Sequence, residues 1–416
     1  MNIVNKVIIN TTFQIAGRLL SFILSFISIF ILTRYLDVSG YGNFVLIFSY
    51  LSFFGFLSDM GLSLIIVREF SKKISNPAKQ METFILIKII LTLLSILLAL
   101  LTLIFFPYSD QIKLAIVIGS FAVAIGGLNG FGASIFQSRL KMDLVTLIDQ
   151  ITKIITVVFI GIFVILKLNF YFIVSSVLLG NSVGFIITLF YLHKEINIFQ
   201  GIKLRNFSLN KKLLKDSLLM GVVTLLAFSY FKVDSLILSI YKNSEELGIY
   251  SLAYKIIENI LLFWGFYMAS IFPLFSLYSK NNFKKYINIF NNSLTLSIIY
   301  SASCLIIGYN QTVFIVNLFG GSKFMQSIIP LKILLLAVPL FLINNIFYHS
   351  FLSLYKIKPV IVSLFISLIF NVLLNIIFIP HYGYIAASYI TVVTELILLI
   401  LYSFFIRRDN INKKLS

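Results

Sequence analysis

The sequence predicts an all-α polytopic membrane protein of twelve transmembrane helices, arranged as two six-helix lobes with both termini in the cytoplasm. Three observations support this prediction: the apolar composition, a regular succession of long apolar segments, and basic residues gathered in every second gap between them. Of the 416 residues, 59% are hydrophobic and 12% are charged, and the mean hydropathy is +1.01. A water-soluble domain could not bury so much apolar surface.

The long apolar segments fit helical spans. A helix needs about 20 apolar residues to cross the hydrocarbon core, whereas a β-barrel strand shows alternation over about ten residues. The predicted spans are 8–33, 41–62, 83–106, 112–135, 145–166, 170–192, 213–240, 247–272, 286–308, 329–352, 359–379 and 384–406. The first is too long for the apolar region of a secretory signal and no small-residue cleavage site follows it, so we expect it to be retained.

The basic residues predict the orientation. When Lys113 and Lys215, at the edges of their spans, are counted with the preceding gaps, the N-terminus, the gaps after even-numbered spans and the C-terminus hold 22 of the 33 Lys and Arg residues. The other gaps hold 5 and the spans hold 6. Cytoplasmic loops of membrane proteins carry such an excess. The net charge of +18 is therefore mainly a topology signal, which also suits anionic lipids, and no aromatic groove suggests a nucleic-acid partner.

The two halves of the chain share a short repeat. Tyr35, Gly42 and Phe44 match Tyr241, Gly248 and Tyr250 at a constant offset of 206 residues. Each half then carries six spans, an even number, so both halves have the same orientation and are related by an axis along the membrane normal. We expect an N-terminal lobe over 1–193, a cytoplasmic linker over 194–212 and a C-terminal lobe over 213–416.

Polar residues recur at helical spacing in several spans and predict the walls of a cleft. The first span has the longest row: Thr11, Gln14, Arg18, Ser21, Ser25 and Ser28. In chain order the others are Ser52, Gly55, Asp59; Lys88, Thr92, Ser95; Thr146, Asp149, Lys153, Thr156; Ser251, Lys255, Glu258; Ser363, Ser367, Asn371; and Tyr384, Ser388, Thr391, Glu395. The alternative is that Ser, Thr and Gly line close helix contacts.

The depth of the charged residues separates two groups. A charge near mid-membrane costs at least about 2.5 kcal/mol, which favours a cleft-lining role for Arg18, Lys255, Glu258 and Glu395. Four lysines lie nearer the span ends, where snorkelling to the headgroups explains them equally well: Lys88, Lys153, Lys232 and Lys332. Asp149 and Lys153 can also form a simple i,i+4 ion pair.

Basic side chains at mid-depth predict an anionic ligand, and phosphate is the anion that they bind best. The candidate substrate-binding residues are Arg18 and Lys255, with Lys153 and Lys232 as lesser candidates. The candidate ion-pair or coupling carboxylates are Glu258, Glu395, Asp149 and Asp59. Cys304 is the only cysteine and the three histidines lack ligand spacing, so we expect no metal and no cofactor.

The segment Asn371–Thr391 resembles the N-x-x-L-N-x-x-x-I-P-x-x-G-x-x-G-A-A-x-x-T region of the MOP exporter superfamily, with Ala386 at the second glycine. Three further stretches are similar to its polysaccharide transporter branch: Gly17-Arg18-Leu19, the segment 35–44, and Asp59-Met60-Gly61-Leu62 followed by Arg68-Glu69. The resemblance covers both halves.

The resemblance implies a MATE/MOP-like fold and a Wzx-type flippase in the bacterial cytoplasmic (inner) membrane, not an enzyme. Such proteins move undecaprenyl-pyrophosphate-linked oligosaccharide repeats to the periplasmic leaflet for O-antigen, lipopolysaccharide or capsule assembly, through a cationic cavity that opens alternately to each side. Implied partners are the lipid-linked oligosaccharide, the membrane, and a polysaccharide polymerase and chain-length regulator. Arg18 also resembles the first-span arginine of lipid II flippases, although those carry fourteen spans.

Two other functions stay open. A multidrug/cation antiporter of the same superfamily would be expected to carry an acidic cation-binding residue in its first span, where this chain has Arg18 and no carboxylate. A membrane-bound polysaccharide polymerase or glycosyltransferase would be expected to carry its catalytic residues in a large external loop, and every predicted external gap is short.

Overall fold

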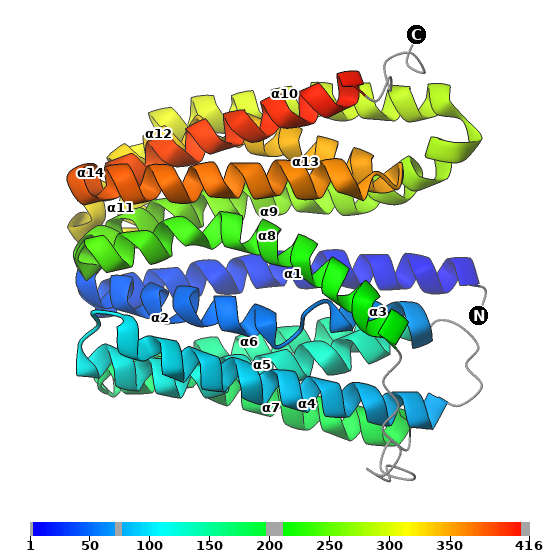
Figure 1. Cartoon of the computed structure of the whole chain (residues 1–416). Coiled ribbons are helices and arrows are strands. Elements are labelled where there is room, and N and C mark those ends of the chain that lie inside the picture. The colour runs from blue at the N-terminus through cyan, green and yellow to red at the C-terminus, as the bar shows by residue number, and fades with distance from the viewer. Residues whose placement is uncertain (1–2, 71–76, 197–210, 409–416) are drawn as a thin grey trace. The chain divides into compact units, whose positions relative to one another are not determined.

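The computed structural model describes residues 3–70, 77–196 and 211–408, and within these ranges the chain forms only helices and their connections (Figure 1). Helices are expected in an apolar solvent, because each satisfies its own backbone hydrogen bonds. The described residues separate into two compact units: unit 1 comprises Met1–Leu36 and Ile47–Leu225, and unit 2 comprises Asp37–Leu46 and Leu226–Ser416. Much of the predicted linker 194–212 lies outside the described residues.

In the first half of the chain, the described residues form seven helices and one 3-10 turn. They are α1 (Ile3–Tyr35), α2 (Asp37–Leu57), α3 (Leu62–Phe70), α4 (Pro77–Thr102), η1 (Leu103–Phe105), α5 (Asp110–Ser138), α6 (Met142–Ile165) and α7 (Phe170–Ile196). A cluster of buried apolar side chains joins α3, α4, α5, α6 and α7 in unit 1, including Ile66, Phe84, Phe136 and Ile148.

In the second half, residues 211–408 form a further seven helices and one 3-10 turn. They are α8 (Lys211–Tyr241), α9 (Ser244–Asn281), α10 (Phe283–Asn310), α11 (Thr312–Gly320), η2 (Ser322–Ser327), α12 (Ile328–Leu335), α13 (Val338–Ser353) and α14 (Ile357–Arg408). In unit 2 a buried cluster joins α8, α13 and α14 and includes Leu226, Phe351, Leu364 and Tyr402.

Ten helices of the described residues are long and apolar enough to cross a membrane, or eleven if Ser322–Leu335 and Val338–Ser353, which are bent by 46°, form one span. This supports a multi-pass membrane protein. The predicted spans 359–379 and 384–406 both fall in α14, and the count of twelve stays a prediction, as does the side on which the termini lie.

Gly383 interrupts α14. As a continuous helix its 52 residues would be about 78 Å long, more than twice the ~30 Å of a hydrocarbon core. Gly383 has φ 56° and ψ −138°, which only glycine adopts readily, and Pro380 precedes it. Figure 1 shows the two halves of α14, orange and red, as separate ribbons joined at one end. The predicted spans 359–379 and 384–406 lie on either side of this interruption.

A second break separates α2 from α3. Residues 58–61 leave the helix, with Met60 at φ 41° and Gly61 at φ 75°. The predicted second span, 41–62, is therefore shorter than expected, since α2 ends at Leu57. Backbone N–H and C=O groups that leave a helix inside a membrane need hydrogen-bond partners from the protein, because lipid offers none.

The segments of the predicted repeat have the same local structure. Tyr35 is the last residue of α1 and Tyr241 the last residue of α8, and a new helix begins within three residues of each. Gly42 lies near the start of α2 and Gly248 near the start of α9. The repeat in the sequence thus corresponds to the same helix–turn–helix junction in both halves.

Candidate functional site

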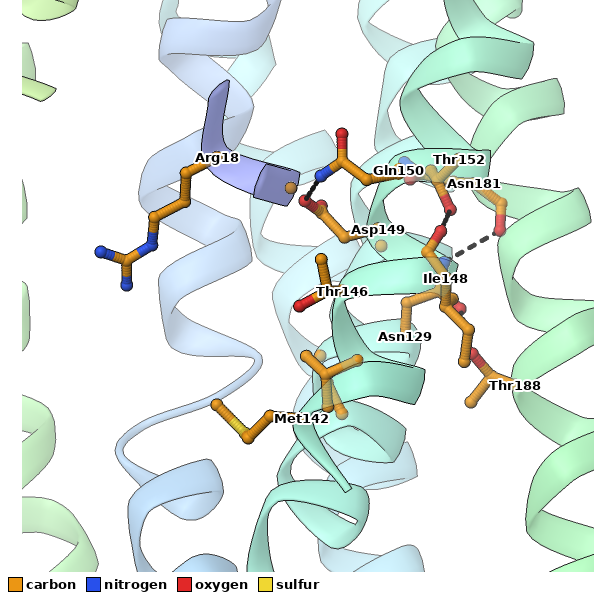
Figure 2. Close-up of a pocket in the computed structure, with 15 residues that line it drawn as sticks. Arg18, Asn129, Met142, Thr146, Ile148, Asp149, Gln150, Thr152, Asn181 and Thr188 are labelled. Atoms are coloured by element: carbon orange, nitrogen blue, oxygen red, sulfur yellow. Dashed lines mark hydrogen bonds between the residues drawn. The ribbon is translucent and has the colours of Figure 1, made fainter. Parts of the chain in front are cut away.

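A pocket of about 410 Å³ lies inside unit 1 among α1, α5, α6 and α7 (Figure 2). Its polar lining includes Arg18, Asn129, Asp149, Gln150, Asn181 and Thr188. A side chain at Gly17 would meet α6, because a Cβ there would lie 2.1 Å from Cγ2 of Thr146. This close approach of the two helices places the predicted residue Arg18 at the pocket.

The predicted pair of Asp149 and Lys153 is formed on α6. Lys153 Nζ lies 2.6 Å from Asp149 Oδ2 and donates to Ser21 Oγ of α1 at 2.9 Å. Gln150 Nε2 donates to the same Ser21 oxygen at 2.8 Å. Lys153 and Asp149 are 42% and 50% exposed. The lysine can be reached by a ligand, but the neighbouring carboxylate already balances its charge.

Arg18 is oriented differently. In Figure 2 its guanidinium extends away from Asp149 and Gln150, although all three line the same pocket. Arg18 and Lys153 thus lie on neighbouring helices, with Arg18 lining the pocket and Lys153 bound to Asp149 and Ser21. That they bind one substrate together stays a prediction.

The opposite wall of the pocket consists of amides and a hydroxyl from α5 and α7. Asn129 Nδ2 donates to the backbone oxygen of Asn181 at 2.9 Å, and Asn181 Nδ2 donates to that of Ala122 at 2.8 Å. Thr188 Oγ1 donates to Asn129 Oδ1 at 3.4 Å. These uncharged groups can donate to or accept from a hydroxyl-rich ligand.

Asp59 belongs to a different place in unit 1, at the break after α2. Lys88 Nζ of α4 lies 3.6 Å from Asp59 Oδ1 and donates to the backbone oxygen of Ser58 at 2.9 Å. Ser58 is the C-cap of α2, where a cation is favourable. Lys88 is 1% exposed, so it does not snorkel to the headgroups. The sequence analysis left snorkelling open, and the burial of Lys88 excludes it. Lys88 instead stabilises the end of α2 at the break.

The candidates of the second half converge on one carboxylate. Lys232 Nζ of α8 donates to Glu258 Oε1 at 2.6 Å, and Lys255 Nζ of α9 donates to Glu258 Oε2 at 2.8 Å. Lys232, Lys255 and Glu258 are 27%, 41% and 26% exposed. We call these three residues the lysine bridge. It lies within unit 2, and its formal charge is +1.

Glu395 is separate from this bridge. It is 1% exposed on α14, and Asn344 Nδ2 of α13 donates to its Oε2 at 2.7 Å and to its backbone oxygen at 2.9 Å. The described polar partners of Glu395 are thus the Asn344 amide and the Tyr230 hydroxyl, which are both uncharged. The expectation that Glu395 holds a base in place finds no support in them, and its predicted role in proton coupling stays a prediction.

Asp234 is a buried carboxylate that the sequence reasoning missed. It is 2% exposed on α8, and its carboxylate accepts from Asn375 Nδ2 at 2.7 Å, Thr391 Oγ1 at 3.1 Å and Tyr250 OH at 3.2 Å. Two signals could have found it: a carboxylate inside a predicted span, and Asn371 with Asn375 one turn apart on one helix face.

The described residues were compared with the side-chain groupings that bind metal ions. They contain no group of three or more His, Cys, Asp or Glu side chains that could hold a metal ion. The oxygen atoms around Asp234 are of the kind that hard cations prefer, but only one of those residues is a carboxylate.

Comparison with known proteins adds a family and a fold. The sequence profile of a family described as "Polysaccharide biosynthesis protein" matches residues 5–279. No curated protein sequence matches the chain significantly.

Several solved structures share the fold over nearly the whole chain. An inward-facing multidrug resistance MATE family transporter of the MOP superfamily matches with a TM-score of 0.78 at 15% identity, over 96% of each chain. Lipid II flippase MurJ, in an inward closed conformation, matches with a TM-score of 0.74 at 17% identity, over 96% of this chain and 87% of that one. A MOP superfamily transporter from Pyrococcus furiosus matches at 0.65 and 15% identity, over 94% and 95%. At these identities the likeness establishes the fold.

Proposed function

The chain belongs to the polysaccharide biosynthesis protein family, and we propose that it is a flippase for undecaprenyl-pyrophosphate-linked oligosaccharide repeat units. It moves these units from the cytoplasmic to the periplasmic leaflet of the bacterial inner membrane by alternating access, for O-antigen or capsular polysaccharide assembly. The fold that the chain shares with MOP superfamily transporters, MurJ among them, supports a translocation function.

The lysine bridge is the observation that carries the proposal. Two ammonium groups from α8 and α9 lie within 2.8 Å of one carboxylate, in helices long and apolar enough to span a membrane. Charges at such depth are expensive, and they persist where they serve a ligand or a pathway. A diphosphate offers several anionic oxygens to paired ammonium groups, which suits two lysines on neighbouring helices.

The pocket of unit 1 supplies the complementary chemistry. Arg18 provides a guanidinium, which binds phosphate in a bidentate fashion, and Asn129, Asn181 and Thr188 provide uncharged hydrogen-bonding groups. We propose that Arg18 and Lys153 engage the headgroup from unit 1 and that the uncharged groups contact sugar hydroxyls. Proteins of the same pathway, a polymerase and a chain-length regulator, are the proposed partners.

The multidrug/cation antiporter is the nearest rival, because a MATE family transporter shares the fold with a TM-score of 0.78. Its substrates are cations, for which an exposed site needs surplus negative charge. The lysine bridge has a formal charge of +1 and Arg18 lines the pocket of unit 1. These positive sites favour an anionic substrate.

The decisive experiment measures the side of the membrane on which lipid-linked repeat units accumulate. Cells that lack the protein are compared with cells restored with the wild type, Arg18→Ala or Lys255→Gln, and the glycan is labelled from outside in spheroplasts and from the cytoplasmic side in inverted vesicles. We expect accumulation on the cytoplasmic side in the deletion strain and in both variants, with relief only by the wild type.

Two controls separate a loss of transport from a loss of protein. Lys323→Gln changes an exposed lysine of η2 and should restore transport fully, and membrane levels of every variant are measured by immunoblot. Unaltered sidedness in the deletion strain, together with new sensitivity to cationic drugs, would replace the proposal with the antiporter function. Normal transport by Arg18→Ala would remove Arg18 from the site.

A further inference from the structure

Glu258 uses both of its carboxylate oxygens within the lysine bridge. Oε1 accepts from Lys232 at 2.6 Å and Oε2 accepts from Lys255 at 2.8 Å. Each ammonium therefore has its own oxygen on a single planar group. Two oxygens on one phosphorus are spaced much like two oxygens on one carboxyl carbon, so a phosphate could occupy the same place between the two lysines.

The bridge is open to a ligand. All three side chains are partly exposed, from 26% for Glu258 to 41% for Lys255. Beneath Lys232 lies the ring of Tyr254, which is only 6% exposed and whose centre lies 5.8 Å from Nζ. The Tyr254 ring is thus held in place by packing. The Glu258 carboxylate between the lysines, in contrast, is partly exposed.

The positive charge of the bridge exceeds its negative charge, which favours replacement of Glu258 by a more highly charged anion. One carboxylate opposes two ammonium groups, so the bridge keeps a formal charge of +1 when empty. A diphosphate diester carries about two negative charges and can neutralise both lysines. If Glu258 stayed between the lysines, its charge would repel the incoming phosphate at short range.

We propose that Glu258 is a built-in competitor of the phosphate: it holds Lys232 and Lys255 together in the empty protein, is displaced when the headgroup binds, and returns to eject the headgroup on the far side. This inference rests on the proposed function and assigns Glu258 a part in release. A carboxylate that only positioned the lysines would instead stay in place during binding.

The two roles predict opposite effects of removing the charge. If Glu258 competes, Glu258→Gln tightens phosphate binding and slows release. If Glu258 only positions the lysines, the same substitution weakens binding, because the ammonium groups then repel one another and separate. Affinity and transport must therefore be measured on the same variants.

The test uses purified full-length protein in nanodiscs and isothermal titration with inorganic pyrophosphate, then with farnesyl diphosphate. We expect Glu258→Gln to bind both probes about tenfold more tightly than the wild type, equivalent to about 1.4 kcal/mol, with a steeper dependence on salt. Lys255→Gln should bind both more weakly. The matched control is Glu245→Gln, an exposed glutamate in the first turn of the same helix, which should leave binding unchanged.

Glu258→Asp keeps the charge but shortens the side chain, so it should bridge the lysines less well and give a smaller gain in affinity. It keeps the inference testable if Glu258→Gln unfolds, which melting temperatures reveal. In proteoliposomes both variants should translocate the lipid-linked substrate more slowly than wild type despite binding diphosphate more tightly.

Weaker or unchanged binding in both Glu258 variants would overturn the inference, and so would unchanged binding by Lys255→Gln, since the probe would then bind elsewhere. A gain confined to the inorganic ion would overturn the assignment to a lipid-linked headgroup. The proposed function fails separately: it is refuted if wild-type protein does not translocate the lipid-linked substrate, whatever the affinities for diphosphate.

Discussion

Gly42 of α2 and Gly248 of α9 each face the backbone of the helix that carries the other. A Cβ on Gly42 would lie 1.8 Å from the backbone oxygen of Ser244 and 2.9 Å from the nitrogen of Gly248, and a Cβ on Gly248 would lie 2.1 Å from the backbone oxygen of Val38. All of these residues belong to unit 2. The two glycines that the sequence repeat pairs at an offset of 206 residues thus meet in space, and neither tolerates a side chain.

Replacing either glycine should separate the two helices. Gly42→Ala and Gly248→Ala each place a methyl group against rigid backbone, so we expect each to lower stability by about 1–3 kcal/mol and to reduce transport. The measurement is the melting temperature in detergent together with glycan assembly in cells. Gly265→Ala on the same α9 has open space around its Cβ and should be neutral or slightly stabilising. Equal behaviour of all three variants would contradict the close contact.

Gly383→Ala should be among the most damaging substitutions in unit 2. The residue has φ 56°, and a Cβ would collide with Glu246 Oε2 at 1.8 Å, where Glu246 accepts from the backbone N–H of Tyr384 at 3.2 Å. Strain and lost contacts together should cost roughly 2–4 kcal/mol, seen as a lower melting temperature. Gly321→Ala separates the two causes, because its φ is 72° but nothing lies near its Cβ. A loss as large at Gly321 would mean that the collision with Glu246 contributes nothing.

Lys88→Met should destabilise unit 1. The substitution removes an ammonium group that is 1% exposed and leaves Asp59 and the Ser58 carbonyl without its contacts at the break after α2. We expect a loss of about 1–3 kcal/mol, measured by thermal unfolding. Lys323→Met, at an exposed position of η2, is the control and should change the melting temperature little. If transport were lost at unchanged stability, Lys88 would have to be reassigned from support of the helix to contact with substrate.

Asp234→Asn should weaken the contact among α8, α9 and α14. The carboxylate accepts from Asn375, Thr391 and Tyr250 through two oxygens, whereas the new amide has one acceptor oxygen and one NH2 group, so at least one of these donors would lose its present acceptor. A cost of about 1–3 kcal/mol is expected. The exchange Asp234→Asn/Asn375→Asp restores a donor and an acceptor between the two positions and should recover part of the melting temperature. No recovery would show that the position of the charge, rather than the hydrogen bond, matters.

Much of the fold could be predicted from local patterns in the sequence. Apolar length gave ten of the spans as separate helices or bent pairs, and Pro380 with Gly383 marked the reversal inside α14. The break of α2 at residues 58–61 was not predicted, because the interruption by Ser58, Asp59 and Gly61 is only four residues long and the apolar run resumes at Leu62. The contact that caps the broken helix comes from Lys88 of α4.

The sequence predicted which charged residues to consider for the site, but not which of them contact one another across helices. Lys255 and Glu258 are three residues apart on one helix, so their contact could be foreseen. The contact of Lys232 with Glu258 joins two helices and depends on how each is rotated. Glu395 was grouped with the bases because of its depth, yet its described polar partners, Asn344 and Tyr230, are uncharged.

The sequence by itself determined the class of protein, the helices and the sites where charge enters the membrane, because hydrophobicity, helical period and the cost of a buried charge act locally along the chain. Only the tertiary structure decided which charge meets which: that Lys232 joins Lys255 on Glu258, that Lys88 supports a helix end, and that Asp234 lies among Asn375, Thr391 and Tyr250. Those pairings depend on the packing and rotation of helices distant in sequence, which no spacing along one helix records.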